Sequence, residues 1–153
     1  PNKVVELLLE KINSKKYIIL NPKIDDLFEN NVYKLIIENK KYIIPLWHDE
    51  LVYEHNNNDI YIKNIPSLPN NISIDNNNNI IVLLHYNVKE IWNNDIVYFN
   101  IGNKNFSITK DEIKLLKEQI IILKNKGISK INTKDIFDIS NKSNIIIKLF
   151  LNI

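Results

Sequence analysis

Two stretches of the chain, IDDLFENNVYKLIIENKKYIIP (residues 24–45) and VKEIWNNDIVYFNIGNKNFSIT (residues 88–109), align without a gap at a shift of 64 residues. Apolar residues recur in the same slots, whereas most mismatches between apolar and polar residues fall on alternate positions. Successive side chains of a strand point to opposite faces, so this pattern predicts a hairpin that occurs twice with one repeated face. The matching apolar pairs are Leu27/Ile91, Phe28/Trp92, Val32/Ile96, Leu35/Phe99, Ile37/Ile101, Tyr42/Phe106 and Ile44/Ile108.

Composition narrows the class of protein. A chain of 153 residues, with 44% hydrophobic and 25% charged residues, suits a globular protein of one domain or two small ones. The net charge is +2 and every basic charge is a Lys, which argues against nucleic acid as a partner. The lack of Cys excludes disulfides and thiolate metal sites, and no apolar run is long enough to span a membrane. We therefore expect a cytoplasmic protein without a membrane partner.

Periodicity and punctuation predict a mainly β fold with short helices. The apolar positions of residues 1–16 fit an amphipathic N-terminal helix. Residues 17–70 and 71–153 are predicted as two tandem β-rich modules, each with a strand, a short helix, a hairpin and two further strands. In the first hairpin, Glu38, Asn39 and Lys40 are predicted to form a three-residue loop.

One short stretch has the residue types of a metal or catalytic site. His48, Asp49 and Glu50 follow Trp47, and His55 lies close behind them. A helical zinc site needs two His residues four apart, whereas these are seven apart in a predicted strand. The chain also has only two Gly residues, so a phosphate-binding loop is not expected. These patterns predict no catalytic residues, no metal and no cofactor.

Three motifs, in their order along the chain, carry a family resemblance: IDDLFENN at 24–31 after a strand, a hairpin that ends in Ile44-Pro45, and QIIILKNKGI at 119–128 followed by NIIIK at 144–148. Over about residues 17–153 they resemble the tandem C-terminal domains of DnaJ-type (J-domain protein) co-chaperones. Each of those domains has a strand, a short helix of the type SLEDLYNG, a hairpin, a strand ending in a KGKGMP turn, and a GDLYV strand. The best single match is KNKG at 124–127, whereas the first module has EHNNN at 54–58 in that turn.

The resemblance implies a non-enzymatic protein that binds unfolded client polypeptides and delivers them to a 70-kDa heat-shock chaperone. The sequence has neither the His-Pro-Asp triplet of a J domain nor the Cys residues of a zinc-binding insertion. No dimerisation helix follows the last predicted strand, so we expect the client-binding part of such a protein and leave its oligomeric state open. The alternative is a β-rich interaction module that binds one fixed protein partner.

The resemblance also places a peptide groove in the first module, between its first strand and the first strand of its hairpin. A Lys often lies near that groove in the family, and this slot holds Tyr33 with Lys34 beside it. Periodicity alone is equally compatible with an ordinary core at these positions. Carried over by position, the groove residues are Ile18, Leu20, Leu35 and Ile37.

Overall fold

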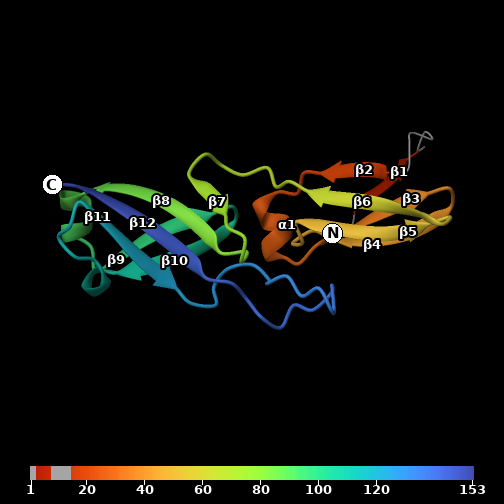
Figure 1. The fold of residues 1–153 in the computed structure, drawn as a ribbon. Coiled ribbons are helices and arrows are strands. Elements are labelled where there is room, and N and C mark those ends of the chain that lie inside the picture. The colour runs from red at the N-terminus through yellow and green to blue at the C-terminus, as the bar shows by residue number, and fades with distance from the viewer. Residues whose placement is uncertain (1–2, 8–14) are drawn as a thin grey trace. The chain divides into compact units, whose positions relative to one another are not determined.

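The computed structural model describes residues 3–7 and 15–153, with side chains from Tyr17 onward. These residues are mainly β, with small sheets and only short helices, as predicted (Figure 1). The chain divides into two compact units. Unit 1 comprises Pro1–Ser67 and Ile131–Ile139, and unit 2 comprises Leu68–Lys130 and Ser140–Ile153.

Unit 1 contains two three-stranded sheets, with strand orders β1-β3-β4 and β2-β6-β5. The β1–β3 and β2–β6 pairs are parallel, whereas β3–β4 and β5–β6 are antiparallel hairpins. The short helix α1 precedes β3. The elements are β1 (Lys3–Leu7), β2 (Lys15–Leu20), α1 (Ile24–Phe28), β3 (Val32–Ile37), β4 (Lys40–Pro45), β5 (Glu50–His55) and β6 (Asn58–Asn64).

The N-terminal helix predicted over residues 1–16 is wrong for Lys3–Leu7, which form strand β1, and for Lys15 and Lys16, which begin strand β2. Residues 1–2 and 8–14 lie outside the described residues. β1 pairs in parallel with β3 from Lys3↔Tyr33 to Leu7↔Ile37. A short apolar run fits either a helix or a strand by period, and here the free edge of β3 supplies the hydrogen-bond partners.

Unit 2 contains a four-stranded sheet of order β11-β12-β8-β7 and the two-stranded hairpin β9–β10. β12 lies between β8, to which it is parallel, and β11, to which it is antiparallel. The elements are β7 (Ile72–Ile74), β8 (Ile80–Asn87), α2 (Val88–Trp92), β9 (Ile96–Ile101), β10 (Lys104–Thr109), the 3-10 turn η1 (Lys110–Glu112), β11 (Glu118–Leu123) and β12 (Ile145–Asn152).

The repeated stretches form the same elements in the same places. α1 and α2, β3 and β9, and β4 and β10 all coincide at the shift of 64 residues, which confirms the two predicted hairpins. The sheets correspond as well, because β2-β6-β5 and β8-β12-β11 each join one parallel and one antiparallel pair. β5 and β11 are therefore equivalent edge strands.

The first hairpin turn is tighter than predicted. Ile37 pairs with Lys40, so only Glu38 and Asn39 connect the strands, and both have positive φ (48° and 67°). Two positive φ values are the mark of a type I′ turn, which matches the twist of a two-residue hairpin. Asn tolerates this conformation better than most residues. Because Lys40 is already paired in β4, the predicted three-residue loop is wrong.

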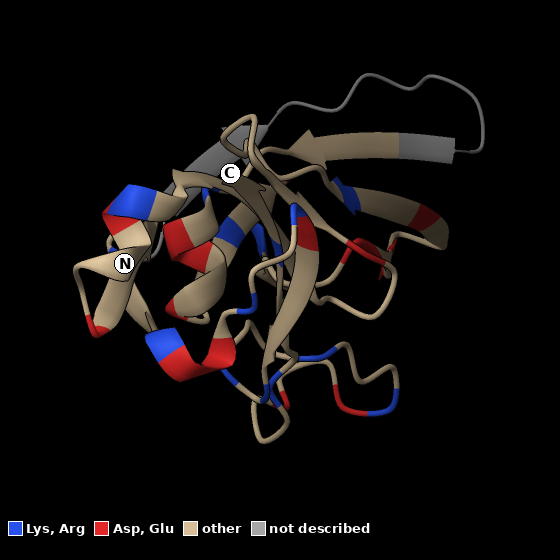
Figure 2. Ribbon diagram, turned by 90° about the vertical axis from the view of Figure 1, so that its left-hand side faces the viewer, with Lys and Arg blue, Asp and Glu red and all other residues tan. Residues whose placement is uncertain are grey.

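Several of the repeated apolar slots lie in the core of each unit. Leu35, Ile37 and Ile44 in unit 1 are at most 1% exposed, and their counterparts Phe99, Ile101 and Ile108 in unit 2 are at most 6% exposed. The face of each hairpin that carries these residues is thus the buried one. Trp92 and Ile96 of unit 2 are instead 57% and 40% exposed. Lys and acidic residues are interspersed along the ribbon (Figure 2). No helix among the described residues has the length and apolar character needed to cross a membrane.

Candidate functional site: an exposed apolar sheet face in unit 1

The predicted groove residues are core residues in the structure. Ile18 and Leu20 of β2 are 6% and 8% exposed, and Leu35 and Ile37 of β3 are 1% and 0% exposed. The two pairs lie in different sheets of unit 1 rather than on neighbouring strands. Side chains buried to this degree cannot contact a bound peptide, so the groove prediction is corrected in favour of the core.

The remaining predicted site residues also lie on an occupied strand. β3 is the central strand of its sheet, with β1 on one edge and β4 on the other. Tyr33 pairs with Lys3 and Ile44, and Lys34 pairs with Val4 and Ile43. Both side chains are half-buried, and burial raises the pKa of Tyr33 above its ordinary value. A peptide cannot add to β3 while β1 is paired there.

The alternate residues of β2 form an exposed apolar surface instead. Tyr17 and Ile19 are 59% and 58% exposed, and Val52 on β5 is 54% exposed. Tyr17 lies opposite Tyr61 of β6, and Tyr61 lies opposite Val52, so these three side chains form one row across the sheet. The Tyr17 and Tyr61 rings stack with their centroids 5.3 Å apart. We refer to Tyr17, Ile19, Val52 and Tyr61 as the β2 face.

The edge and rim of the β2 face fit an extended polypeptide. Among the described strands, β2 pairs only with β6, so none of them occupies the backbone donors and acceptors of its other edge. Ile19 lies opposite Lys63, which lies opposite Glu50, so a charged pair borders the apolar row. A strand added at this edge would gain backbone hydrogen bonds and place alternate side chains on the apolar row.

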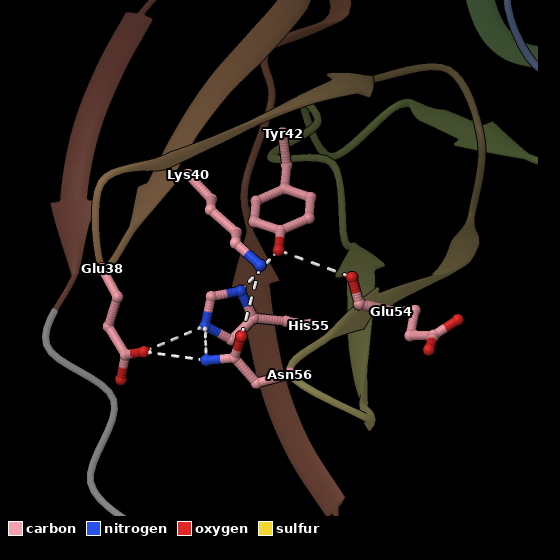
Figure 3. A network of polar contacts seen from close by, with 6 residues as sticks. All are labelled: Glu38, Lys40, Tyr42, Glu54, His55 and Asn56. Carbon is pink, nitrogen blue, oxygen red and sulfur yellow. Dashed lines mark hydrogen bonds and ion pairs between the residues drawn. The ribbon is translucent and has the colours of Figure 1, made fainter.

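A polar cluster joins the β3–β4 turn to the β5–β6 turn of unit 1 (Figure 3). The buried ring of His55 bonds through Nε2 to a carboxylate oxygen of Glu38 at 3.2 Å, and Tyr42 bonds to Nδ1 of the same ring. Asn56 donates to the same Glu38 oxygen at 3.1 Å and accepts a bond from Lys40 at 3.2 Å. We refer to this group as the turn cluster: Glu38, Lys40, Tyr42, Glu54, His55 and Asn56.

The turn cluster resembles a relay of hydroxyl, imidazole and carboxylate, but its electrostatics oppose nucleophilic chemistry. Burial and the negative charge of Glu38 both raise the pKa of the Tyr42 phenol. A phenol that holds its proton is a weak nucleophile, and an activated nucleophile requires the opposite shift. The described residues also contain no group of three metal-ligating side chains arranged to hold an ion. The cluster is best explained as a tie between two hairpin turns.

His48, the other His of the candidate metal stretch, holds a distant segment of the chain. Its Nε2 donates to the carbonyl oxygen of Ile136 at 2.8 Å, within the part of unit 1 contributed by Ile131–Ile139. The His48 carbonyl accepts a bond from the buried Asn64 amide at 2.8 Å. His48 is only 2% exposed, and this burial lowers its pKa below the ordinary value.

A small hollow in unit 2 is a further surface feature, besides a larger one of about 450 Å³ that is lined in part by His85, Glu118 and Phe150. The small hollow measures about 260 Å³ and is lined by apolar residues that include Ile91, Trp92 and Leu115. Lys110 donates to the Trp92 carbonyl at 2.8 Å and lies 4.8 Å from the centre of its ring. Ligand pockets usually measure about 300 to 1,000 Å³, so the hollow is small for a dedicated small-molecule site.

Comparison with known proteins adds no further constraint, since no protein-family model and no curated protein matches the chain.

The β2 face was found from the structure, although the sequence contained a signal for it. Tyr17, Ile18, Ile19 and Leu20 are apolar at every position, so one pair had to face away from the core.

Proposed function

We propose that this chain is the client-binding part of a cytoplasmic DnaJ-type co-chaperone and that it captures extended apolar segments of unfolded polypeptides on the β2 face. The open edge of β2 beside the exposed Tyr17 and Ile19 is the observation that carries the proposal. The order of strand, short helix, hairpin and two strands in both halves also agrees with the order that the resemblance implies.

The strength of such a site suits transient capture. Full burial of one large apolar side chain contributes about 1.5 to 3 kcal/mol, and ordering an extended peptide offsets much of that gain. Backbone hydrogen bonds to β2 would not depend on the client's sequence. Weak and promiscuous binding is what delivery of clients to a 70-kDa heat-shock chaperone requires, because the client must be released again.

A binding assay with surface variants tests the proposal. The probe is a fluorescent extended peptide rich in Leu and Val, and its anisotropy is measured against the wild-type chain and Ile19→Asp. Ile19 is exposed, so the variant should stay folded, and we expect at least a tenfold loss of affinity. Tyr98→Asp is the matched control, since Tyr98 is a 70% exposed strand residue of unit 2 and should leave binding unchanged.

Suppression of aggregation separates a co-chaperone from a module with one fixed partner. A client-binding fragment should delay the aggregation of several unrelated denatured proteins, and Ile19→Asp should remove that effect. A fixed-partner module would ignore all of them. Equal peptide binding by the wild type and Ile19→Asp would contradict the β2 face as the site.

A further inference from the structure

The edge strand β11 of unit 2 has an unusual surface. It is the outermost strand of the order β11-β12-β8-β7, and among the described strands it pairs only with β12. On its outward face Ile120 is 63% exposed and Ile122 is 49% exposed. Glu118 precedes them on the same face, and the exposed Lys124 follows the strand two residues beyond Ile122. A long apolar edge strand is a template for pairing with another strand.

The equivalent edge strand in unit 1, β5, shows how charged residues can protect an edge from pairing with a second copy. Strand β5 has Glu50, Val52 and Glu54 on its outward face, where β11 has Glu118, Ile120 and Ile122. Two such β5 strands paired about Tyr53, the equivalent of Ile121, would place Val52 opposite Glu54, so a charged carboxylate would be packed against an apolar side chain. The change from Glu54 to Ile122 between the two equivalent edges removes that mismatch.

The geometry points to a second copy of this chain as the occupant of the β11 edge, with the two β11 strands antiparallel about a two-fold axis through Ile121. Two four-stranded sheets would then join into one sheet with their outward faces on the same side. This association lies outside the proposed function and involves a different strand from the β2 face.

Charge and shape select this register. Residues that lie opposite each other in an antiparallel pair point to the same face of the sheet. The outward faces of the two copies therefore lie on the same side only if the two-fold axis passes through a residue. An axis between two residues would place outward side chains of one copy opposite inward side chains of the other. An axis through Ile120 places Glu118 opposite Ile122, and an axis through Ile122 places Ile120 opposite Lys124. Only the axis through Ile121 places Glu118 opposite Lys124 and Ile120 opposite Ile122, at both ends of the pair. Opposite charges and paired β-branched residues are the favourable cross-strand neighbours.

The closed symmetry limits the assembly to a dimer. Each β11 edge is used once, and the far edge of the sheet is β7, a strand of only three residues. The interface is small, so we expect a dissociation constant on the order of 10 µM.

Sedimentation equilibrium over protein concentrations up to about 300 µM tests the association. The wild-type chain should fit a monomer–dimer equilibrium, and Ile122→Glu, which restores the pattern of β5, should be monomeric throughout. Tyr98→Glu is the control for a charge placed on another exposed strand of unit 2 and should dimerise normally. A monomeric wild type, or a dimer that survives Ile122→Glu, would overturn the proposal. Loss of client-peptide binding in Ile122→Glu with an unchanged dimer would instead assign the edge to clients.

Two further experiments test the register. Glu118→Lys and Lys124→Glu should each weaken the dimer about tenfold, and the double variant should return to within about twofold of the wild type. Because the chain has no Cys, Ile120→Cys and Ile122→Cys give clean cross-linking probes. A mixture of these two variants should form disulfide-linked dimers under mild oxidation, whereas either variant alone should not, since its two sulfurs would lie on diagonal rather than opposite positions. Efficient cross-linking of each variant with itself would exclude this register.

Discussion

The imidazole Nε2 of His48 lies 2.8 Å from the carbonyl oxygen of Ile136, which is 88 residues further along the chain. This bond fixes the segment Ile131–Ile139 within unit 1, although the residues on both sides of that segment belong to unit 2. A buried His from the stretch with metal-ligand residue types thus serves as an anchor for the chain. Its titration should be visible in the stability of the protein.

Stability should fall on mild acidification because of His48. Burial lowers its pKa in the folded state below the ordinary value of 6.5. Between these two pKa values the unfolded chain binds more protons, so the free energy of unfolding drops by up to about 1.4 kcal/mol per pH unit as the pH falls below about 6.5. The fall ends once the folded-state pKa is passed.

Urea unfolding at several pH values between about 5 and 7.5 measures this effect. In His48→Gln, the amide can still donate to the Ile136 carbonyl but does not titrate, so the pH dependence of the variant should be shallower than that of the wild type. Parallel pH profiles for the two proteins would show that His48 is not the titrating group.

Truncation to Ala should distinguish the buried core of unit 1 from its exposed β2 face. Ile37→Ala removes a fully buried side chain and should cost about 2 to 5 kcal/mol of unfolding free energy. Ile19→Ala changes a 58% exposed side chain and should stay within about 0.5 kcal/mol of the wild type. Urea midpoints at neutral pH provide the comparison. Similar losses in both variants would mean that the β2 face is packed against something in solution.

The turn at Gly127 should tolerate no side chain. A Cβ at this position would collide with the Ser143 hydroxyl and lie 3.0 Å from the Ser143 carbonyl oxygen and 3.1 Å from that of Asn144. Gly127→Ala should therefore cost about 1 to 3 kcal/mol. Ser143→Ala removes the colliding hydroxyl, so the double variant should recover part of the loss in a double-mutant cycle measured by urea unfolding. Strict additivity would mean that the collision is relieved elsewhere.

The hairpin turns should respond differently to Gly. Asn57 has a φ of 63°, and Asn57→Gly should stabilise the protein by about 0.5 kcal/mol, since Gly adopts this conformation without strain. Glu38→Gly relieves the same kind of strain at a φ of 48°, but it also removes the carboxylate that binds His55 and Asn56. We expect a net loss of stability for Glu38→Gly in thermal unfolding. A gain equal to that of Asn57→Gly would show that the turn cluster contributes nothing.

The sequence predicted the parts of the fold that depend on local pattern. Both hairpins were predicted from alternating apolar residues and from the ungapped match at a shift of 64 residues. This works because a hairpin pairs two strands that are neighbours in the sequence, so its pattern lies within a short stretch. The parallel β2–β6 and β8–β12 pairs were not predicted, since they join strands far apart in the sequence. The sequence assigned Val4, Val5 and Leu7 to a helix for a related reason. Their spacing does not reveal that a distant strand, β3, has an unpaired edge with which they can form hydrogen bonds.

The candidate site was predicted less well than the hairpins. Alternation correctly grouped Ile18 with Leu20 and Leu35 with Ile37, but it does not state which face of a strand is turned inward. Both pairs point into the core from two different sheets. The exposed pair, Tyr17 and Ile19, lies at the other positions of the same strand. Only the three-dimensional arrangement of the sheets separates these two possibilities.

The interleaving of the two units sets an order for folding during synthesis. Unit 1 is complete only after Ile131–Ile139 has left the ribosome, by which time most of unit 2 has already been made. Unit 2 in turn waits for β12, the strand that lies between β8 and β11 in its main sheet. The local hairpins can form early, whereas the distant parallel pairings must form late because loop closure over a long stretch is slow. Until β12 is made, β8 and β11 have no strand between them, and the nascent chain then exposes the most unpaired strand edge.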